Sequence, residues 1–175
     1  VRTFSERDVS EAIELRGTLE GLSARLAAER GVAPKLLAAA RECLDRIDAV
    51  LSQPALDDEA FSSYVTLNET FHALVGDMAG SSVIARELER VVSLPFASPS
   101  GFVVQQANSP QARDMLVVAQ DQHRQVLDAI AAREGSRAEA IMREHSRIAQ
   151  RNLREALENR QLDQMPGVRL IRTRA

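Results

Sequence analysis

The sequence predicts an all-α fold, an antiparallel bundle of about six to seven helices. Three observations support this: apolar residues recur at spacings of three and four almost throughout, alternation of apolar and polar residues is scarce, and helix-breaking residues separate the periodic stretches. A chain of 175 residues suits one domain with a sizeable core. Amphipathic helices joined by short connections bury their apolar faces most economically as an antiparallel bundle.

Helix starts and stops divide the chain into elements. Helices are predicted over residues 6–30, 34–53, 58–79, 82–94, 110–133 and 137–161. Ser5 is a suitable N-cap for the first, Pro34 and Pro110 suit first turns, and Ser136 with Glu139 forms a capping box for the last. Residues 95–110 predict a long loop. The bundle is expected to span 1–164, with a short, loosely packed C-terminal tail over 165–175.

Composition and charge narrow the class of protein. Hydrophobic residues make up 45% and charged residues 27% of the chain, which is ordinary globular composition. No apolar run reaches the roughly 20 residues of a membrane span, so we expect a soluble protein. Cys43 is the single cysteine and lies in an apolar helical pattern, which favours a buried, inert thiol in a reducing, cytoplasmic compartment. The net charge of -3 argues against direct nucleic-acid binding by these residues.

All three histidines lie on apolar stripes, each on a different predicted helix: His72, His123 and His145. Asn68 lies one turn before His72, so the two side chains stack on one face. An unpaired buried polar group costs about 1–3 kcal/mol, and one shared metal ion would satisfy all three imidazoles at once. Three imidazole nitrogens with the Asn68 oxygen suit Zn²⁺, and also Ni²⁺, Co²⁺ or Fe²⁺. The alternative is that each histidine is a satisfied core residue.

Other polar residues border the same inward faces. Arg16 lies beside the inward stripe of the first helix, and from the residues alone a salt bridge with Glu20 is the simpler interpretation. Asn152, two turns beyond His145, is either a structural amide or a hydrogen-bonding group for a ligand. Ser23 and Gln120 are lesser candidates for ligand binding.

Two rival functions stay open at this point. A histidine-rich metal centre with an open coordination position could activate water in a metal-dependent hydrolytic enzyme. Against it, Glu69 and Glu144 are the acids adjacent to the histidines and both point away from the inward stripes, and the sequence has neither a glycine-rich phosphate loop nor a nucleophile elbow. A metal-free structural dimerisation module is the other alternative.

A set of ordered motifs resembles a known family. Residues 14–20 (E-L-R-G-T-L-E) are similar to an E-x-R-x-x-L-E opening, and residues 68–72 (N-E-T-F-H) to a D-x-x-F-H motif. His123 in Q-H-R-Q-V-L-D-A-I and His145 in A-I-M-R-E-H then follow at the expected separation. Together, over essentially the whole chain, these motifs resemble the C-terminal effector-binding (FCD) domain of FadR-subfamily GntR-type bacterial transcription regulators.

The resemblance implies a site and a function. In that family an Asp and three His hold a divalent metal, which corresponds here to Asn68, His72, His123 and His145. Asn68 departs from the usual Asp, so a neutral amide oxygen would bind the metal more weakly. The family's effector-gripping arginine corresponds to Arg16, whose guanidinium fork pairs with a carboxylate.

The resemblance also implies partners. We expect a homodimeric, non-enzymatic sensor of a small carboxylate effector that controls DNA binding allosterically. DNA would be contacted only through an N-terminal winged helix-turn-helix domain that is not found in these residues. The resemblance further leads us to expect that Arg16→Ala abolishes stabilisation by a carboxylate and leaves the fold intact.

Overall fold

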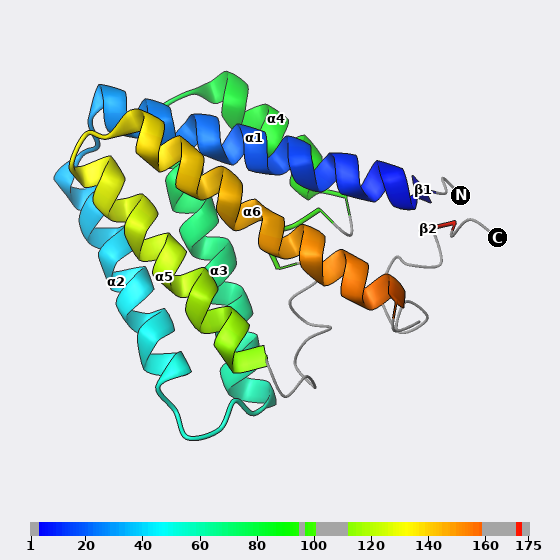
Figure 1. The fold of residues 1–175 in the computed structure, drawn as a ribbon. Helices are drawn as coiled ribbons and strands as arrows, with labels where there is room; N and C mark the ends of the chain where they lie inside the picture. Colours follow the sequence, from blue (N-terminus) through cyan, green and yellow to red (C-terminus); the bar gives the residue numbers. More distant parts are fainter. Residues whose placement is uncertain (1–3, 95–96, 101–111, 159–170, 173–175) are drawn as a thin grey trace.

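The computed structural model describes residues 4–94, 97–100, 112–158 and 171–172, and these form a helical bundle (Figure 1). The helices are α1 (Glu6–Arg30), α2 (Pro34–Leu51), α3 (Asp58–Met78), α4 (Ser82–Val92), α5 (Ala112–Ala131) and α6 (Gly135–Glu158). A two-residue parallel ladder between β1 (Phe4–Ser5) and β2 (Ile171–Arg172) joins the two ends of the chain. The prediction of an all-α bundle is confirmed.

Capping residues set the starts of two long helices. The Ser5 hydroxyl accepts from the N–H of Asp8 at 3.1 Å, and the Asp8 carboxylate accepts from the N–H of Ser5 at 2.7 Å, so α1 begins with the predicted cap and its reciprocal bond. The Asp57 carboxylate accepts from the N–H of Ala60 at 2.8 Å and caps α3. Pro34 occupies the first turn of α2, as predicted.

The predicted start of the last helix is wrong, because α6 already begins at Gly135 and Ser136 lies inside it. The turn is made by Arg133, which has a φ of 66°. Its N–H bonds to the carbonyl three residues back, and the N–H of Glu134 bonds to the carbonyl five residues back, which together form a Schellman C-cap on α5. The Arg133 guanidinium donates to the Glu29 carbonyl at 2.7 Å. This arginine therefore takes the position that glycine usually fills.

The arrangement of helices places three of them around one interior region. In Figure 1, α1 and α6 run antiparallel, side by side, along the top of the molecule, and α2, α3 and α5 pack below them at an angle. α4 covers part of α1 and α3. The larger core cluster draws buried apolar side chains from α1, α2, α3, α5 and α6. Inward residues of α3, α5 and α6 therefore face a common interior, which positions the candidate site.

Glycine allows α1 and α6 to approach closely at Gly17. A Cβ at this position would lie 2.1 Å from the Oγ and 2.5 Å from the Cβ of Ser146. We expect Gly17→Ala to lower the free energy of unfolding by about 1–3 kcal/mol, measured by urea denaturation, because the helices must separate. Gly76→Ala is the matched control, since its Cβ would meet its nearest atom at 3.6 Å and alanine favours a helix interior. A Gly17→Ala variant as stable as wild type would contradict this packing.

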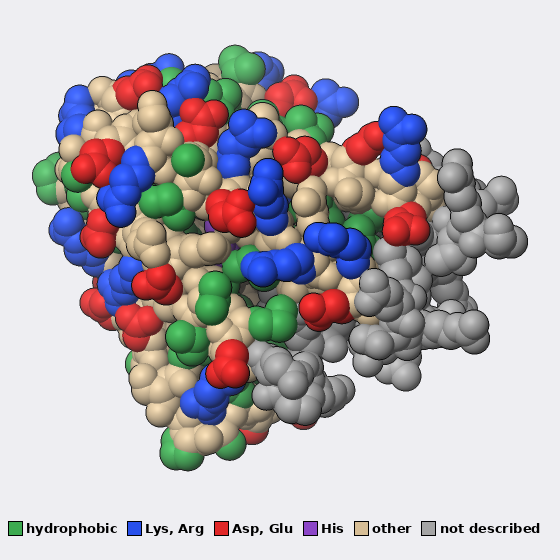
Figure 2. Space-filling view, viewed as in Figure 1, with side chains coloured by type: hydrophobic (Ala, Val, Ile, Leu, Met, Phe, Trp, Pro, Cys, Tyr) green, Lys and Arg blue, Asp and Glu red, His purple; other side chains and the backbone are tan. Residues whose placement is uncertain are grey.

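Several sequence-based expectations concern the surface and the thiol. Cys43 is buried and free, as predicted, and its thiol donates to the Leu67 carbonyl at 3.3 Å. On the face shown in Figure 2, basic and acidic side chains lie next to one another. Within the described residues, no helix has the length and apolar character to cross a membrane. Most of the predicted loop over 95–110, the predicted helix start at Pro110 and most of the tail over 165–175 lie outside the described residues.

Candidate metal centre

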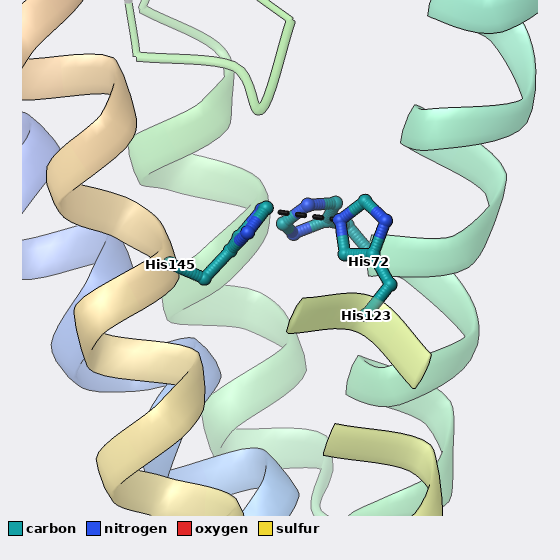
Figure 3. Close-up of side chains that lie close together, drawn as sticks. All are labelled: His72, His123 and His145. Atoms are coloured by element: carbon teal, nitrogen blue, oxygen red, sulfur yellow. Dashed lines mark hydrogen bonds between the residues drawn. The ribbon is translucent and has the colours of Figure 1, made fainter. Parts of the chain in front are cut away.

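The three histidines meet inside the bundle, as the sequence predicts. His72 comes from α3, His123 from α5 and His145 from α6, and their exposed fractions are 5%, 0% and 8%. Figure 3 shows the three rings pointing toward one another. One ligand nitrogen from each lies within 4.8 Å of the others, and the Nε2 atoms of His123 and His145 are 3.1 Å apart. This spacing is close enough for all three to bind one metal ion.

Hydrogen bonds on the outer edge of each ring define where its proton lies. Each Nδ1 faces a side-chain oxygen, at 2.7 Å for His72 and at 3.2 Å for both His123 and His145. The three oxygens belong to Glu20, Gln120 and Gln122, respectively. A carboxylate or amide oxygen accepts, so each Nδ1 donates its N–H. A neutral ring in this arrangement presents an unprotonated Nε2 to the interior.

The three histidine nitrogens are better suited to bind a cation than to bond with the groups around them in the bundle. His72 Nε2 is buried and has no hydrogen-bond partner among the described residues. The Nε2 atoms of His123 and His145 lie 3.1 Å apart, so without a cation they form a hydrogen bond only when one of the two rings carries its proton on Nε2. A divalent metal ion accepts all three lone pairs, and acceptors on the far nitrogens are the usual support of metal-binding imidazoles.

Burial and mutual proximity disfavour charged imidazoles in the metal-free site. Burial, with a further contribution from His72, lowers the pKa of His145 to about 3. Burial, followed by the neighbouring His145, lowers the pKa of His123 well below its usual 6.5. Burial alone would raise the pKa of Glu20, but Arg16 and His72 outweigh it and lower this pKa to about 2. In the metal-free centre the rings of His123 and His145 are therefore neutral, and Glu20 is an ionised carboxylate.

The metal-free protein should lose stability as the pH falls from about 6.5 toward 3, the two ends of the shift for His145. In this window the unfolded histidine binds a proton and the folded one does not, so acid favours unfolding by about 1.4 kcal/mol per pH unit for each such histidine. Glu20 adds to the loss below pH 4.5, because its folded pKa is also depressed. Urea denaturation with a chelator at several pH values measures this. A constant free energy of unfolding between pH 7 and 5 would contradict the buried neutral histidines.

Arg16 is fully enclosed beside the histidines, with an exposed fraction of 1%. Its Nη1 donates to the Glu20 carboxylate at 2.8 Å, so the salt bridge suggested by the sequence is present and buried. Its Nε has no hydrogen-bond partner among the described residues. Arg16 lines a cavity of about 20 Å³ with His145, Asn68, Asn152 and Tyr64, among others.

Asn152 and Asn68 lie on the wall of this cavity. Both amide atoms of Asn152 are buried and have no hydrogen-bond partner among the described residues. An unsatisfied buried amide is costly, so Asn152 is well suited to a polar ligand or water. Asn68 is buried one turn before His72, and its amide nitrogen donates to the Ser100 hydroxyl at 3.1 Å.

Two other candidates from the sequence are not among the residues that line the cavity. The Ser23 hydroxyl donates to the Leu19 carbonyl of its own helix at 2.9 Å. The Gln120 amide nitrogen donates to the Leu44 carbonyl at 2.9 Å and to Asp48 at 2.8 Å, while its oxygen faces His123. Gln120 therefore orients a histidine in this structure.

Sequence reasoning missed two residues that orient the histidines, Glu20 and Gln122. From the sequence, Glu20 is expected only as a salt-bridge partner of Arg16. Its contact with His72 joins α1 to α3, and the two residues are 52 positions apart along the chain. Gln122 directly precedes His123 but contacts His145. The available signal was a carboxylate one turn after Arg16 on an inward stripe.

A larger hollow of about 460 Å³ lies along α3 and α4 and reaches His72 and Glu20. Its wall combines small and apolar side chains with three exposed acids, Glu69, Asp77 and Glu89. The acidic wall disfavours an anion there, so Arg16 remains the better place for a carboxylate.

Fold and site together define an all-helical domain with three core imidazoles placed to bind one metal ion. The chain belongs to the FCD domain family, whose model matches residues 11–147. FCD domains are effector-binding regulatory domains of GntR-type transcription regulators. A comparison with curated protein sequences finds no match.

Proposed function

We propose that this bundle is the effector-sensing and dimerisation domain of a FadR-type regulator, with a metal-centred pocket for a small organic acid. The observation that carries the proposal is the set of three buried imidazoles whose ligand nitrogens lie within 4.8 Å of one another. A metal ion would bind these nitrogens, and the Nε of the neighbouring Arg16, which has no hydrogen-bond partner among the described residues, is available to donate to an anion. A carboxylate ligand would bind to both the metal ion and the Arg16 guanidinium.

The proposed metal ligands are Asn68, His72, His123 and His145. Three imidazoles with an amide oxygen suit zinc first, and nickel, cobalt or iron(II) also fit this donor set. The amide of Asn68 is neutral, so the metal is held less tightly than by a carboxylate at the same place. A bound metal would supply an open coordination position for an oxygen of the ligand.

The proposed anion site is the guanidinium of Arg16. Its Nη1 is occupied by Glu20, while its Nε is buried and has no hydrogen-bond partner in the described part of the chain. A ligand carboxylate would accept from this Nε, and Asn152 would donate to or accept from a second polar group of the ligand. Binding would thereby satisfy groups that are unsatisfied in the present conformation.

The size of the cavity implies a conformational response. A volume of about 20 Å³ holds about one water molecule, so an organic acid needs a conformation with more space beside Arg16. A ligand that binds only this wider conformation shifts the population toward it, typically with a coupling of about 1–3 kcal/mol. In a cytoplasmic homodimer this shift would alter the spacing of attached DNA-binding domains.

A thermal-shift series tests the proposed function. We expect one or more small carboxylates to raise the melting temperature of the zinc-loaded protein, and Arg16→Lys to weaken the response because lysine lacks the guanidinium fork. Absence of a shift across mono-, di- and hydroxycarboxylates would contradict sensing of organic acids. Turnover of an acid would instead favour the metal-dependent enzyme, and absence of both metal and ligand binding would favour a structural module.

A further inference from the structure

Glu20 connects the two parts of the proposed site through its two carboxylate oxygens. Its Oε2 accepts from Arg16 Nη1 at 2.8 Å, and its Oε1 lies 2.7 Å from His72 Nδ1. The side chain is only 3% exposed, so water does not compete for these oxygens. One carboxylate therefore holds a residue of α1 and a residue of α3 in fixed positions.

The contact with His72 determines which ring nitrogen is bare. A carboxylate has no proton to donate, so the neutral imidazole must donate from Nδ1. This leaves Nε2 without a proton, and Nε2 is the atom that faces the other two histidines without a partner. An amide can present either oxygen or nitrogen to a ring, but a carboxylate presents only acceptors. Glu20 therefore fixes the tautomer of His72 strictly. The two glutamines fix the tautomers of their partners less strictly, Gln120 for His123 and Gln122 for His145.

The negative charge of Glu20 also suits a position next to the proposed metal site. The four proposed metal ligands are neutral, so none of them offsets the charge of a divalent ion. Glu20 is the anion in hydrogen-bond contact with one of the histidines, and a carboxylate behind an imidazole strengthens it as a metal ligand. We propose that Glu20 is a positioning residue that presents His72 Nε2 to the metal and anchors Arg16 for the ligand. This inference rests on the proposed metal site.

A neutral amide can support only one of these two links. In Glu20→Gln, the amide oxygen is expected to face the Arg16 cation, which needs an acceptor. The amide N–H₂ then faces His72 Nδ1, which must accept, and the ring proton moves to Nε2. The expected result is a change of His72 tautomer in the metal-free protein and zinc binding weakened about 10–100-fold.

Two measurements on the same proteins test this inference. Isothermal titration with zinc gives the affinity, and long-range ¹H–¹⁵N correlation spectra of the metal-free protein give the tautomer of each of the three histidines. The matched control is Glu11→Gln, because Glu11 forms an i,i+4 pair with Arg7 on the same helix but is 61% exposed. The control should keep wild-type affinity and tautomers.

The outcomes separate this inference from the metal site itself. If the wild-type protein binds zinc and Glu20→Gln binds it equally tightly with His72 unchanged, the positioning role is wrong and the metal site stands. If the wild-type protein binds no zinc, the metal site is wrong. If Glu20→Gln does not fold, the wild-type spectrum still decides, because a His72 proton on Nε2 would overturn the inference.

Discussion

His123→Ala is expected to abolish metal binding. His123 is fully buried, and its Nε2 lies 3.1 Å from that of His145, so its removal takes away one of the three lone pairs at the centre of the site. With zinc at 100 times its dissociation constant, the wild-type protein should gain about 2.7 kcal/mol of stability. For a chain of this length that corresponds to a rise in melting temperature of about 5–11 °C. The variant should show no such rise.

Elemental analysis and zinc-dependent thermal melting measure this effect. The control is Ile47→Val, a buried truncation on α2, a helix that carries none of the three histidines; it should cost about 0.5–1.5 kcal/mol and leave zinc binding unchanged. One equivalent of zinc retained by His123→Ala would show that the metal ligands are wrongly assigned. Equal loss of zinc in the control would show that metal binding responds to general destabilisation.

Arg16→Ala is expected to destabilise the protein by about 3–5 kcal/mol. The guanidinium and the Glu20 carboxylate are 2% and 3% exposed, so removing the cation strands a buried anion. The sequence led us to expect an intact fold in this variant, and the burial of the pair adds to that expectation a large loss of stability. Urea denaturation of the metal-free protein measures the loss without any contribution from ligand.

Arg7→Ala is the matched control for this variant. Arg7 and Glu11 have the same i,i+4 geometry on α1, but their side chains are 86% and 61% exposed, so solvent screens their pair and it contributes little to stability. The difference between the two variants isolates the effect of burial. Equal effects would mean that Arg16 and Glu20 are hydrated in solution, and Arg16 would then lose its role as a buried anion site.

The sequence predicted the histidine cluster because the required information is local. Each histidine lies at helical spacing within an apolar stripe, and inward stripes of a bundle must share one interior. The residues that orient the histidines by hydrogen bonds could not be predicted in this way. The contact between Glu20 and His72 depends on how α1 packs on α3, and no single stretch of sequence contains this tertiary arrangement.

Local sequence rules also failed at the end of α5, where an arginine takes the conformation that usually belongs to glycine. The positive φ at the end of α5 belongs to Arg133 and not to Gly135, and the Arg133 guanidinium bonds to the Glu29 carbonyl. That tertiary contact supports an arginine in a conformation that glycine adopts more readily. The volume beside Arg16 likewise depends on the packing of several helices, so no single stretch of sequence contains it.

Anomalous scattering from crystals grown with zinc locates the bound metal directly. We expect one strong peak in the bundle interior, about 2.1 Å from Nε2 of each of His72, His123 and His145. A peak bound through Nδ1, a peak elsewhere, or an empty interior with excess zinc in the crystal would contradict this expectation.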